Sequence, residues 1–164
     1  NKNHQLVSII SLSYLANVCL ILVIFGQIHF NLFKIPHNED PLNKLMGWHI
    51  TATQIEKSVS SFGYKYPKFI ISREYQLSSA LALYMKNKPI PHSIEKPERN
   101  KWSPIDNVKK NGAIIVCEIN DCEKTLQKAK NKFNNNIIPL NKITTTIREK
   151  VIRKIYIHYL LPKI

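Results

Sequence analysis

The chain has 164 residues and a formal net charge of +13, from 24 Lys and Arg against 11 Asp and Glu. This length allows one domain of ordinary size, or a smaller domain with an appendage. The 44% hydrophobic share is unevenly spread, because no charged residue occurs between Leu6 and Phe25 whereas the remainder is strongly polar. This division excludes a wholly soluble domain and a multi-span membrane protein. It predicts one membrane helix joined to one water-facing domain.

The positive charge is carried mainly by lysine, with 20 Lys to 4 Arg. Lys, Asn and Ile share A/T-rich codons, so mutational drift in an A/T-rich genome explains much of this excess. Nucleic-acid surfaces typically use Arg, whose planar fork grips phosphates and guanine edges. The charge therefore predicts affinity for anionic surfaces, including lipid headgroups, and we expect no nucleic-acid partner.

The apolar stretch from Leu6 to Phe25 is long enough, as a helix of roughly 30 Å, to cross the hydrocarbon of a bilayer. A cleaved signal peptide is disfavoured because no small-residue cleavage site follows Phe25. A buried core helix is disfavoured because the stretch is apolar around its whole circumference. We therefore expect a transmembrane helix at about 6–25 within a segment 1–38 that includes a juxtamembrane linker, and a water-facing domain over 39–164.

The water-facing part begins with an amphipathic helix from Leu42 to Val59, with Asp40 as its cap, Pro41 at its first position and Gly63 closing it. Short apolar runs and amphipathic stretches then alternate. In chain order they predict a strand at 68–72, a helix at 76–85, an edge strand at 89–94, a polar loop at 95–108, a strand at 113–117, a helix from Asp121 to Phe133, and alternating stretches at 143–147 and 155–159 around a turn at 148–150.

This order of elements predicts an α/β fold. Strand–helix–strand units with short buried strands imply a mainly parallel sheet with helices packed on it, and the alternating C-terminus allows a final antiparallel hairpin. About 125 residues suffice for one such core. We therefore expect one N-terminal transmembrane helix followed by a small, mainly parallel α/β sandwich domain.

Cysteines and histidines give little sign of chemistry. Cys19 lies inside the apolar run, whereas Cys117 and Cys122 can bridge in an oxidising compartment; a buried thiol and a loop thiol is the favoured interpretation. Their C-x4-C spacing lacks the second pair that a zinc site needs. The chain contains no Gly-rich phosphate loop, no H-E-x-x-H pattern and no nucleophile elbow. We expect no catalytic residue, metal site or cofactor in this chain.

Two polar stretches are candidate ligand contacts, with a structural role as the favoured alternative for both. The first follows a predicted parallel strand, where ligands gather in open α/β sheets, and consists of Arg73, Tyr75 and Gln76. The second is a loop with an aromatic platform among hydrogen-bond donors, which suits carbohydrate, and consists of Arg99, Asn100 and Trp102.

These stretches belong to a series of blocks that resembles a known family. The matching residues are Asp40-Pro41, Leu45, Gly47-Trp48, Tyr75-Gln76, Ser79, Leu81-Ala82, Tyr84, Lys88-Pro89, Arg99-Asn100 and Trp102. In this order, after an apolar span, they resemble the C-terminal region of bacterial membrane glycosyltransferases related to protein O-mannosyltransferases and the lipid A aminoarabinose transferase. The resemblance extends from Leu6 to about Ile119. The chain departs from it at Leu83, where the family commonly has Phe, and in the shortened loop at 100–102.

The resemblance implies a function at the outer face of a membrane. Such enzymes transfer a sugar from a polyprenyl-phosphate donor to a lipid or protein acceptor, and their catalytic acidic residues lie in a many-span N-terminal part. We therefore expect a C-terminal fragment with a non-catalytic periplasmic domain at the inner membrane. Its partners would be membrane lipid and, through the N-terminal part, the polyprenyl-phosphate sugar. The alternative is a single-span, membrane-anchored binding or interaction module with a basic surface.

Overall fold

The structure is a computed structural model that describes residues 2–30, 32–33, 46–64, 66–147 and 149–163. The chain divides into two compact units, Asn1–Leu42 and Asn43–Ile164. The predicted helix cap at Asp40 and Pro41 lies outside the described residues, as does Leu45 of the resemblance.

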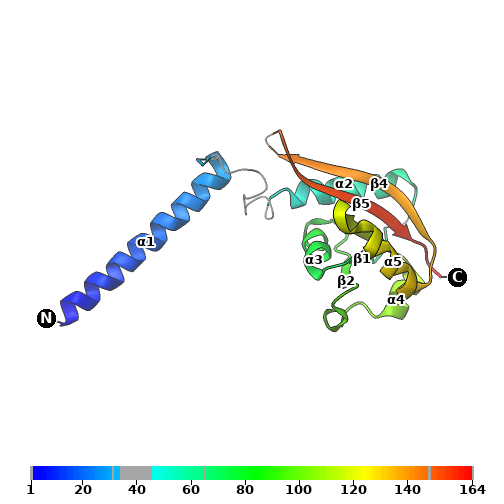
Figure 1. The fold of residues 1–164 in the computed structure, drawn as a ribbon, viewed down its shortest axis with the longest axis horizontal. Coiled ribbons are helices and arrows are strands. Elements are labelled where there is room, and N and C mark those ends of the chain that lie inside the picture. Colours follow the sequence, from blue (N-terminus) through cyan, green and yellow to red (C-terminus); the bar gives the residue numbers. More distant parts are fainter. Residues whose placement is uncertain (1, 31, 34–45, 65, 148, 164) are drawn as a thin grey trace. The chain divides into compact units, whose positions relative to one another are not determined.

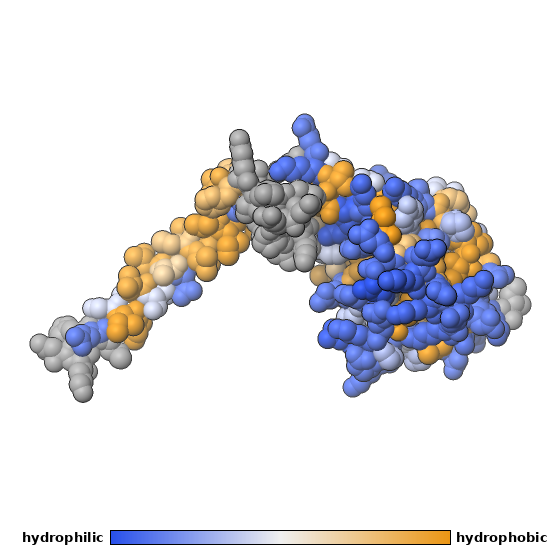
Figure 2. Space-filling view, viewed as in Figure 1, coloured by the Kyte–Doolittle hydropathy of each residue, from blue (hydrophilic) through white to orange (hydrophobic). Residues whose placement is uncertain are grey.

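The first unit contains one long helix, α1 (Lys2–Phe30), drawn in blue in Figure 1. Its segment Val7–Phe30 is long and apolar enough to cross a membrane, and apolar residues dominate its face in Figure 2. Leu12 and Tyr14, which project from opposite sides of the helix, are 68% and 74% exposed. Burial of so much apolar surface in lipid is strongly favourable. The predicted apolar helix is thus confirmed, and it extends beyond 6–25 at both ends.

The second unit is built on a five-stranded sheet with the order β2-β1-β3-β5-β4. The strands are β1 (Phe69–Ser72), β2 (Ile90–Ser93), β3 (Ala113–Glu118), β4 (Ile137–Ile147) and β5 (Lys150–Leu160). β1 pairs in parallel with β2 and with β3. β5 runs antiparallel to β3 and to β4. The α/β fold, its parallel strands and the final antiparallel hairpin are confirmed.

Four α-helices cover the two faces of this sheet: α2 (Trp48–Ser61), α3 (Tyr75–Tyr84), α4 (Ile105–Asn111) and α5 (Cys122–Phe133). The core under α2 and α3 includes Ile70, Ile114 and Val116 of the sheet. The core under α4 and α5 includes Ile71 and Ile115. Successive residues of β1 and β3 thus point to opposite cores, as the pleat of a strand requires. Burial on both faces explains the unbroken apolar runs at 69–71 and 113–117.

Two helices differ from the sequence-based expectation. α2 begins at Trp48, since Gly47 immediately before it has a left-handed φ of 76° and a Cβ there would lie 2.3 Å from Cδ1 of Ile152. The short α4 occupies the end of the predicted polar loop at 95–108. Its apolar pattern is too brief to detect, because Val108 is its one buried residue.

Candidate functional site

The connections of the sheet create a crevice between the C-terminal ends of β1 and β3. The chain leaves β1 into α3 on one face, whereas it leaves β3 into α5 on the opposite face. In open α/β sheets, ligands bind where the connections that follow two neighbouring strands leave to opposite faces of the sheet. A cleft of about 470 Å³ lies at this point. It is lined by Trp48, Arg73, Glu74, Gln76, Leu77, Ala80, Val116, Cys117, Glu118, Asp121, Thr125 and Arg153.

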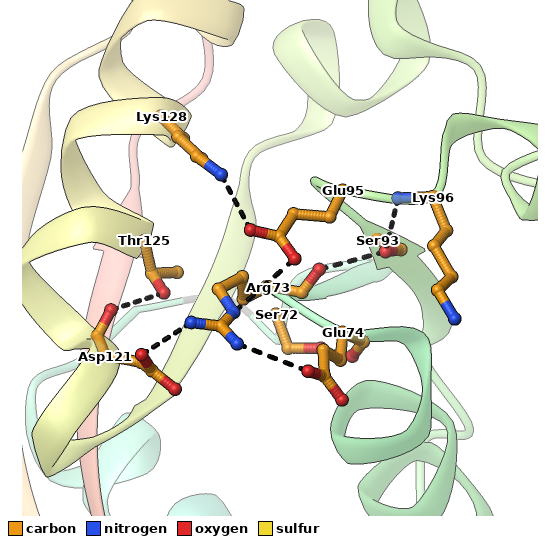
Figure 3. A network of polar contacts seen from close by, with 9 residues as sticks. All are labelled: Ser72, Arg73, Glu74, Ser93, Glu95, Lys96, Asp121, Thr125 and Lys128. Atoms are coloured by element: carbon orange, nitrogen blue, oxygen red, sulfur yellow. Dashed lines mark hydrogen bonds and ion pairs between the residues drawn. The ribbon is translucent and has the colours of Figure 1, made fainter.

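Arg73 is the hub of an ion-pair network at the rim of the cleft (Figure 3). Its Nη1 donates a hydrogen bond of 2.5 Å to Oδ1 of Asp121, and its Nη2 lies 3.3 Å from Oε1 of Glu74. Its Nε lies 3.5 Å from Oε2 of Glu95, which also pairs with Lys128 at 2.6 Å. The Glu74 hydrogen bond raises the pKa of Arg73, and the charges of Asp121 and Glu95 add to this. The network connects the end of β1 with the loop after β2 and with the start of α5.

This network gives Asp121 a different role from the expected helix cap. Asp121 does occupy the N-cap position of α5, but its carboxylate makes no capping hydrogen bond within the helix. The carboxylate points to Arg73 instead, while the Asp121 backbone carbonyl accepts a hydrogen bond from Oγ1 of Thr125 at 2.7 Å. An ion pair to a guanidinium thus outweighs the cap at this position.

The cleft lining also includes an aromatic ring stacked with a cation. The Arg153 guanidinium, from β5, lies 3.5 Å from the ring centroid of Trp48 at the start of α2. Nη1 of Arg153 also donates to the Met46 carbonyl at 3.2 Å. Burial lowers the pKa of Arg153, and the charge of Glu118 opposes this shift. Trp48 and Arg153 were not among the residues that the sequence analysis singled out; the Gly-Trp pair in the resemblance was the one signal for Trp48.

The structure brings the two predicted ligand stretches together. Gln76 lines the cleft beside Arg73. The Arg99 guanidinium lies 5.8 Å from the ring centroid of Tyr75, within the range of a cation–π contact. Trp102 is 79% exposed and is not among the residues that line the cleft.

Asn100 holds the polar loop against β2. Its side-chain amide donates to the Ser93 carbonyl at 2.7 Å and accepts from the Ser93 N–H at 2.8 Å. Its Nδ2 also lies 3.2 Å from Nε2 of His92. These contacts use most of the hydrogen-bonding capacity of the amide. Asn100 therefore has a structural role, which is the alternative to ligand binding that the sequence analysis favoured.

His92 is fully buried at the centre of the same loop network. Its Nδ1 lies 2.9 Å from the Ser103 carbonyl, which can only accept, so Nδ1 carries the proton. The other ring nitrogen then accepts from Asn100. Burial, with the charge of Lys132 as the second cause, lowers the pKa of His92 to about 4. His92 therefore stays neutral at physiological pH and fixes the loop.

Cys117 and Cys122 form a disulfide, so the interpretation as two separate thiols is wrong. Cys117 lies in β3 and Cys122 is the first residue of α5, and their Cα atoms are 4.8 Å apart. Sequence spacing could not show this, because the one-turn 3-10 helix at Ile119–Asp121 reverses the chain between them. The bridge borders the cleft, since Cys117 also lines it.

The opposite charges of the cleft lining are close to balanced. Arg73 and Arg153 are opposed by three carboxylates, on Glu74, Glu118 and Asp121, so the lining has no excess of positive charge. Carboxylate oxygens accept hydrogen bonds from hydroxyls. The Trp48 ring also lines the cleft, with one of its faces stacked on the Arg153 guanidinium. This combination favours binding over proton transfer, because Glu74 and Asp121 are already paired with Arg73.

No protein-family model matches this chain, and neither a curated protein nor a solved structure matches it.

Proposed function

We propose that this chain is the C-terminal part of a membrane glycosyltransferase that uses a polyprenyl-phosphate sugar, and that its α/β unit is the non-catalytic exoplasmic domain. The observation that carries this proposal is the convergence of three separate sequence blocks of the resemblance at one edge of the sheet. Trp48 and Gln76, from two blocks, line the same cleft. Arg99, from the third, lies over Tyr75 of the second.

The chemistry of the cleft supports a sugar as its ligand. The cleft combines a tryptophan, which Arg153 covers on one face, with charged and amide hydrogen-bonding groups, and such a combination matches the C–H and hydroxyl surfaces of a pyranose ring. The ion pairs of Arg73 hold Glu74 and Asp121 in fixed positions before any ligand binds. Such preorganisation reduces the entropy lost on binding.

Helix α1 and the Cys117–Cys122 disulfide support a location at the exoplasmic face of a membrane. The apolar helix α1 would keep the domain at the bilayer, where a lipid-linked donor and its acceptor both diffuse. Disulfides persist in oxidising compartments such as the bacterial periplasm and are rare in the cytosol. The Cys117–Cys122 bridge therefore favours the exoplasmic side. In this role the domain shields the sugar from water and positions the acceptor, while the catalytic acids belong to another part of the enzyme.

Photoaffinity labelling tests the proposal directly. The full chain in detergent would be illuminated with a polyprenyl-phosphate mannose that carries a diazirine on the sugar, and labelled peptides would be mapped. We expect labelling around the cleft and a several-fold loss in Trp48→Ala and Gln76→Ala. Gln127→Ala is the matched control, because Gln127 is an exposed glutamine of α5 outside the cleft lining. Equal labelling of wild type, Trp48→Ala and Gln76→Ala would refute a sugar site in this cleft.

The second candidate is a single-span, membrane-anchored interaction module, which the formal net charge of +13 favours. A basic surface gains about 1 kcal/mol per lysine or arginine near an anionic leaflet. Under this alternative, binding to phosphatidylglycerol vesicles would fall steeply with salt while the sugar probe labels nothing. Under the glycosyltransferase proposal, labelling of the cleft persists at high salt.

A further inference from the structure

We propose that Cys117, Cys122 and His158 form a zinc site when the disulfide is reduced. The two sulfur atoms and a ring nitrogen of His158 all lie within 4.8 Å of one another. Two thiolates and one imidazole are a known ligand set for zinc, with the fourth tetrahedral position left to water. The sequence analysis missed this site because His158 is 36 residues away from Cys122 and joins the pair through sheet pairing.

The register of the sheet explains why these residues meet. Ile115 of β3 stands directly opposite His158 of β5, and Cys117 lies two residues further along β3. Residues two apart on a strand share a face, so Cys117 and His158 are diagonal neighbours on one face of the sheet. Cys122 approaches this face from the first turn of α5, which packs there through Ala129.

The imidazole of His158 has the property expected of a ligand that is not bound. Its Nδ1 is one of three buried side-chain polar atoms that lack a hydrogen-bond partner among the described residues. Leaving a buried polar atom unsatisfied costs free energy, so such atoms are uncommon and call for an explanation. A coordinate bond to a metal would satisfy this nitrogen.

Reduction and metal binding form a balanced sequence of steps. A dithiol reductant transfers two electrons to the disulfide, the S–S bond breaks, and each sulfur takes up a proton. Zinc then displaces the two thiol protons and binds both thiolates, without a further redox change. With Zn–S bonds of about 2.3 Å, the two sulfurs must separate to roughly 3.8 Å, which a side-chain rotation at either cysteine can supply. The disulfide and the zinc-loaded state therefore exclude each other.

This inference does not depend on the proposed sugar-binding function. It concerns the α5 side of β3, and it would hold for an interaction module as well. Cys117 also lines the cleft, so exchange between the two states would change one wall of that cleft.

Metal titration of the full chain in detergent tests the proposal. Protein reduced with a phosphine and freed of reductant without air would be titrated with Zn²⁺, and with Co²⁺ as a spectroscopic substitute. We expect about one Zn²⁺ per reduced chain, thiolate-to-cobalt charge-transfer absorption, and no uptake by the oxidised chain. His158→Gln should weaken Zn²⁺ binding at least tenfold. Cys19→Ser is the matched control, because Cys19 is a free cysteine in α1 and should have no effect.

Several results would overturn the assignment. They are reduced wild type that binds Zn²⁺ no more tightly than Cys117→Ser, His158→Gln that binds as tightly as wild type, or loss of binding in Cys19→Ser. Binding of Cu⁺ without Zn²⁺ would overturn the choice of zinc. Should Cys117→Ser fail to fold, His158→Gln still decides the matter, because it keeps both cysteines and can be checked by circular dichroism in its disulfide form.

Discussion

Gly112 shows how a single residue can fix the start of a central strand. Its φ of 74° lies in the left-handed region, and a Cβ there would be 2.7 Å from the backbone oxygen of Leu160. Neither the conformation nor the contact tolerates a side chain. Gly63 has a similar φ of 71°, but a Cβ there meets no atom within 4 Å. Substitutions at these two glycines therefore distinguish the cost of backbone strain, which both positions carry, from the cost of a steric clash, which only Gly112 carries.

We predict that Gly112→Ala destabilises the second unit by about 3 kcal/mol or more, since backbone strain and overpacking add. Gly63→Ala should cost only the left-handed penalty, about 1–2 kcal/mol. Urea unfolding in detergent, followed by the fluorescence of Trp48 and Trp102, measures both, because both tryptophans belong to this unit. Equal losses in the two variants would show that the clash with Leu160 is unimportant.

His92 makes stability depend on pH. Its pKa is lowered from 6.5 to about 4 in the folded chain, so the unfolded chain binds a proton more readily between these values. Stability should therefore fall as the pH drops from about 6.5 towards 4, by up to about 3 kcal/mol. The loss should level off below pH 4, where the folded state is protonated too. Unfolding free energies at several pH values, compared with those of His92→Gln, isolate this contribution.

If the difference between wild type and His92→Gln stays constant from pH 7 to pH 4, the buried neutral histidine is not the cause. The comparison matters because carboxylates also begin to titrate at the lower end of this window. Glu95, for example, has its pKa lowered by its hydrogen bond to Lys128, and this pair is present in both proteins.

At the scale of elements, the disulfide attaches the end of β3 to the start of α5. It closes a short loop, for which the chain-entropy model gives a stabilisation of about 2 kcal/mol. We predict that the double variant Cys117→Ala, Cys122→Ala loses about this amount in urea unfolding under oxidising conditions. Reduction of the wild type in the presence of a chelator should give the same loss. Cys19→Ser should lose nothing, and a loss in Cys19→Ser equal to that of the double variant would contradict this account.

The elements were predictable where their pattern is long or their burial complete. β3 could be located because its residues from Ala113 to Cys117 are apolar without interruption, as burial on both faces demands. α4 could not, because seven residues with one buried side chain leave no periodicity to detect. The start of α2 was misplaced because its boundary depends on the contact of Gly47 with Ile152, which lies more than 100 residues away.

The site was predictable only in part, for a similar reason. Arg73 and Gln76 were found because they follow a buried strand, and strand ends are where ligands gather. Arg153 lies between the predicted turn at 148–150 and the predicted stretch at 155–159, and its strand β5 is brought to the cleft by pairing with β3. The same pairing places His158 beside the two cysteines. Arg153 and His158 were missed because the register between distant strands, which local sequence does not encode, determines their neighbours.

At the scale of the whole molecule, the account requires that α1 lies in lipid. Lysine at the centre of a membrane helix costs about 2.5–3.5 kcal/mol per residue in insertion. We predict that the double variant Leu15→Lys, Val18→Lys moves the chain from membrane pellets to the soluble fraction. Ile50→Lys is the control, because Ile50 is 42% exposed on α2 and its substitution should not affect fractionation. Pelleting of the double variant like the wild type would contradict insertion of α1.

The most direct test of the central claim is a fusion of alkaline phosphatase to the C-terminus of the full chain in bacterial cells. This reporter is active only where its own disulfides form, outside the cytosol. We predict phosphatase activity that stays in the membrane pellet after alkaline carbonate extraction. An inactive reporter, or activity released into the supernatant, would contradict a membrane-anchored domain on the exoplasmic side.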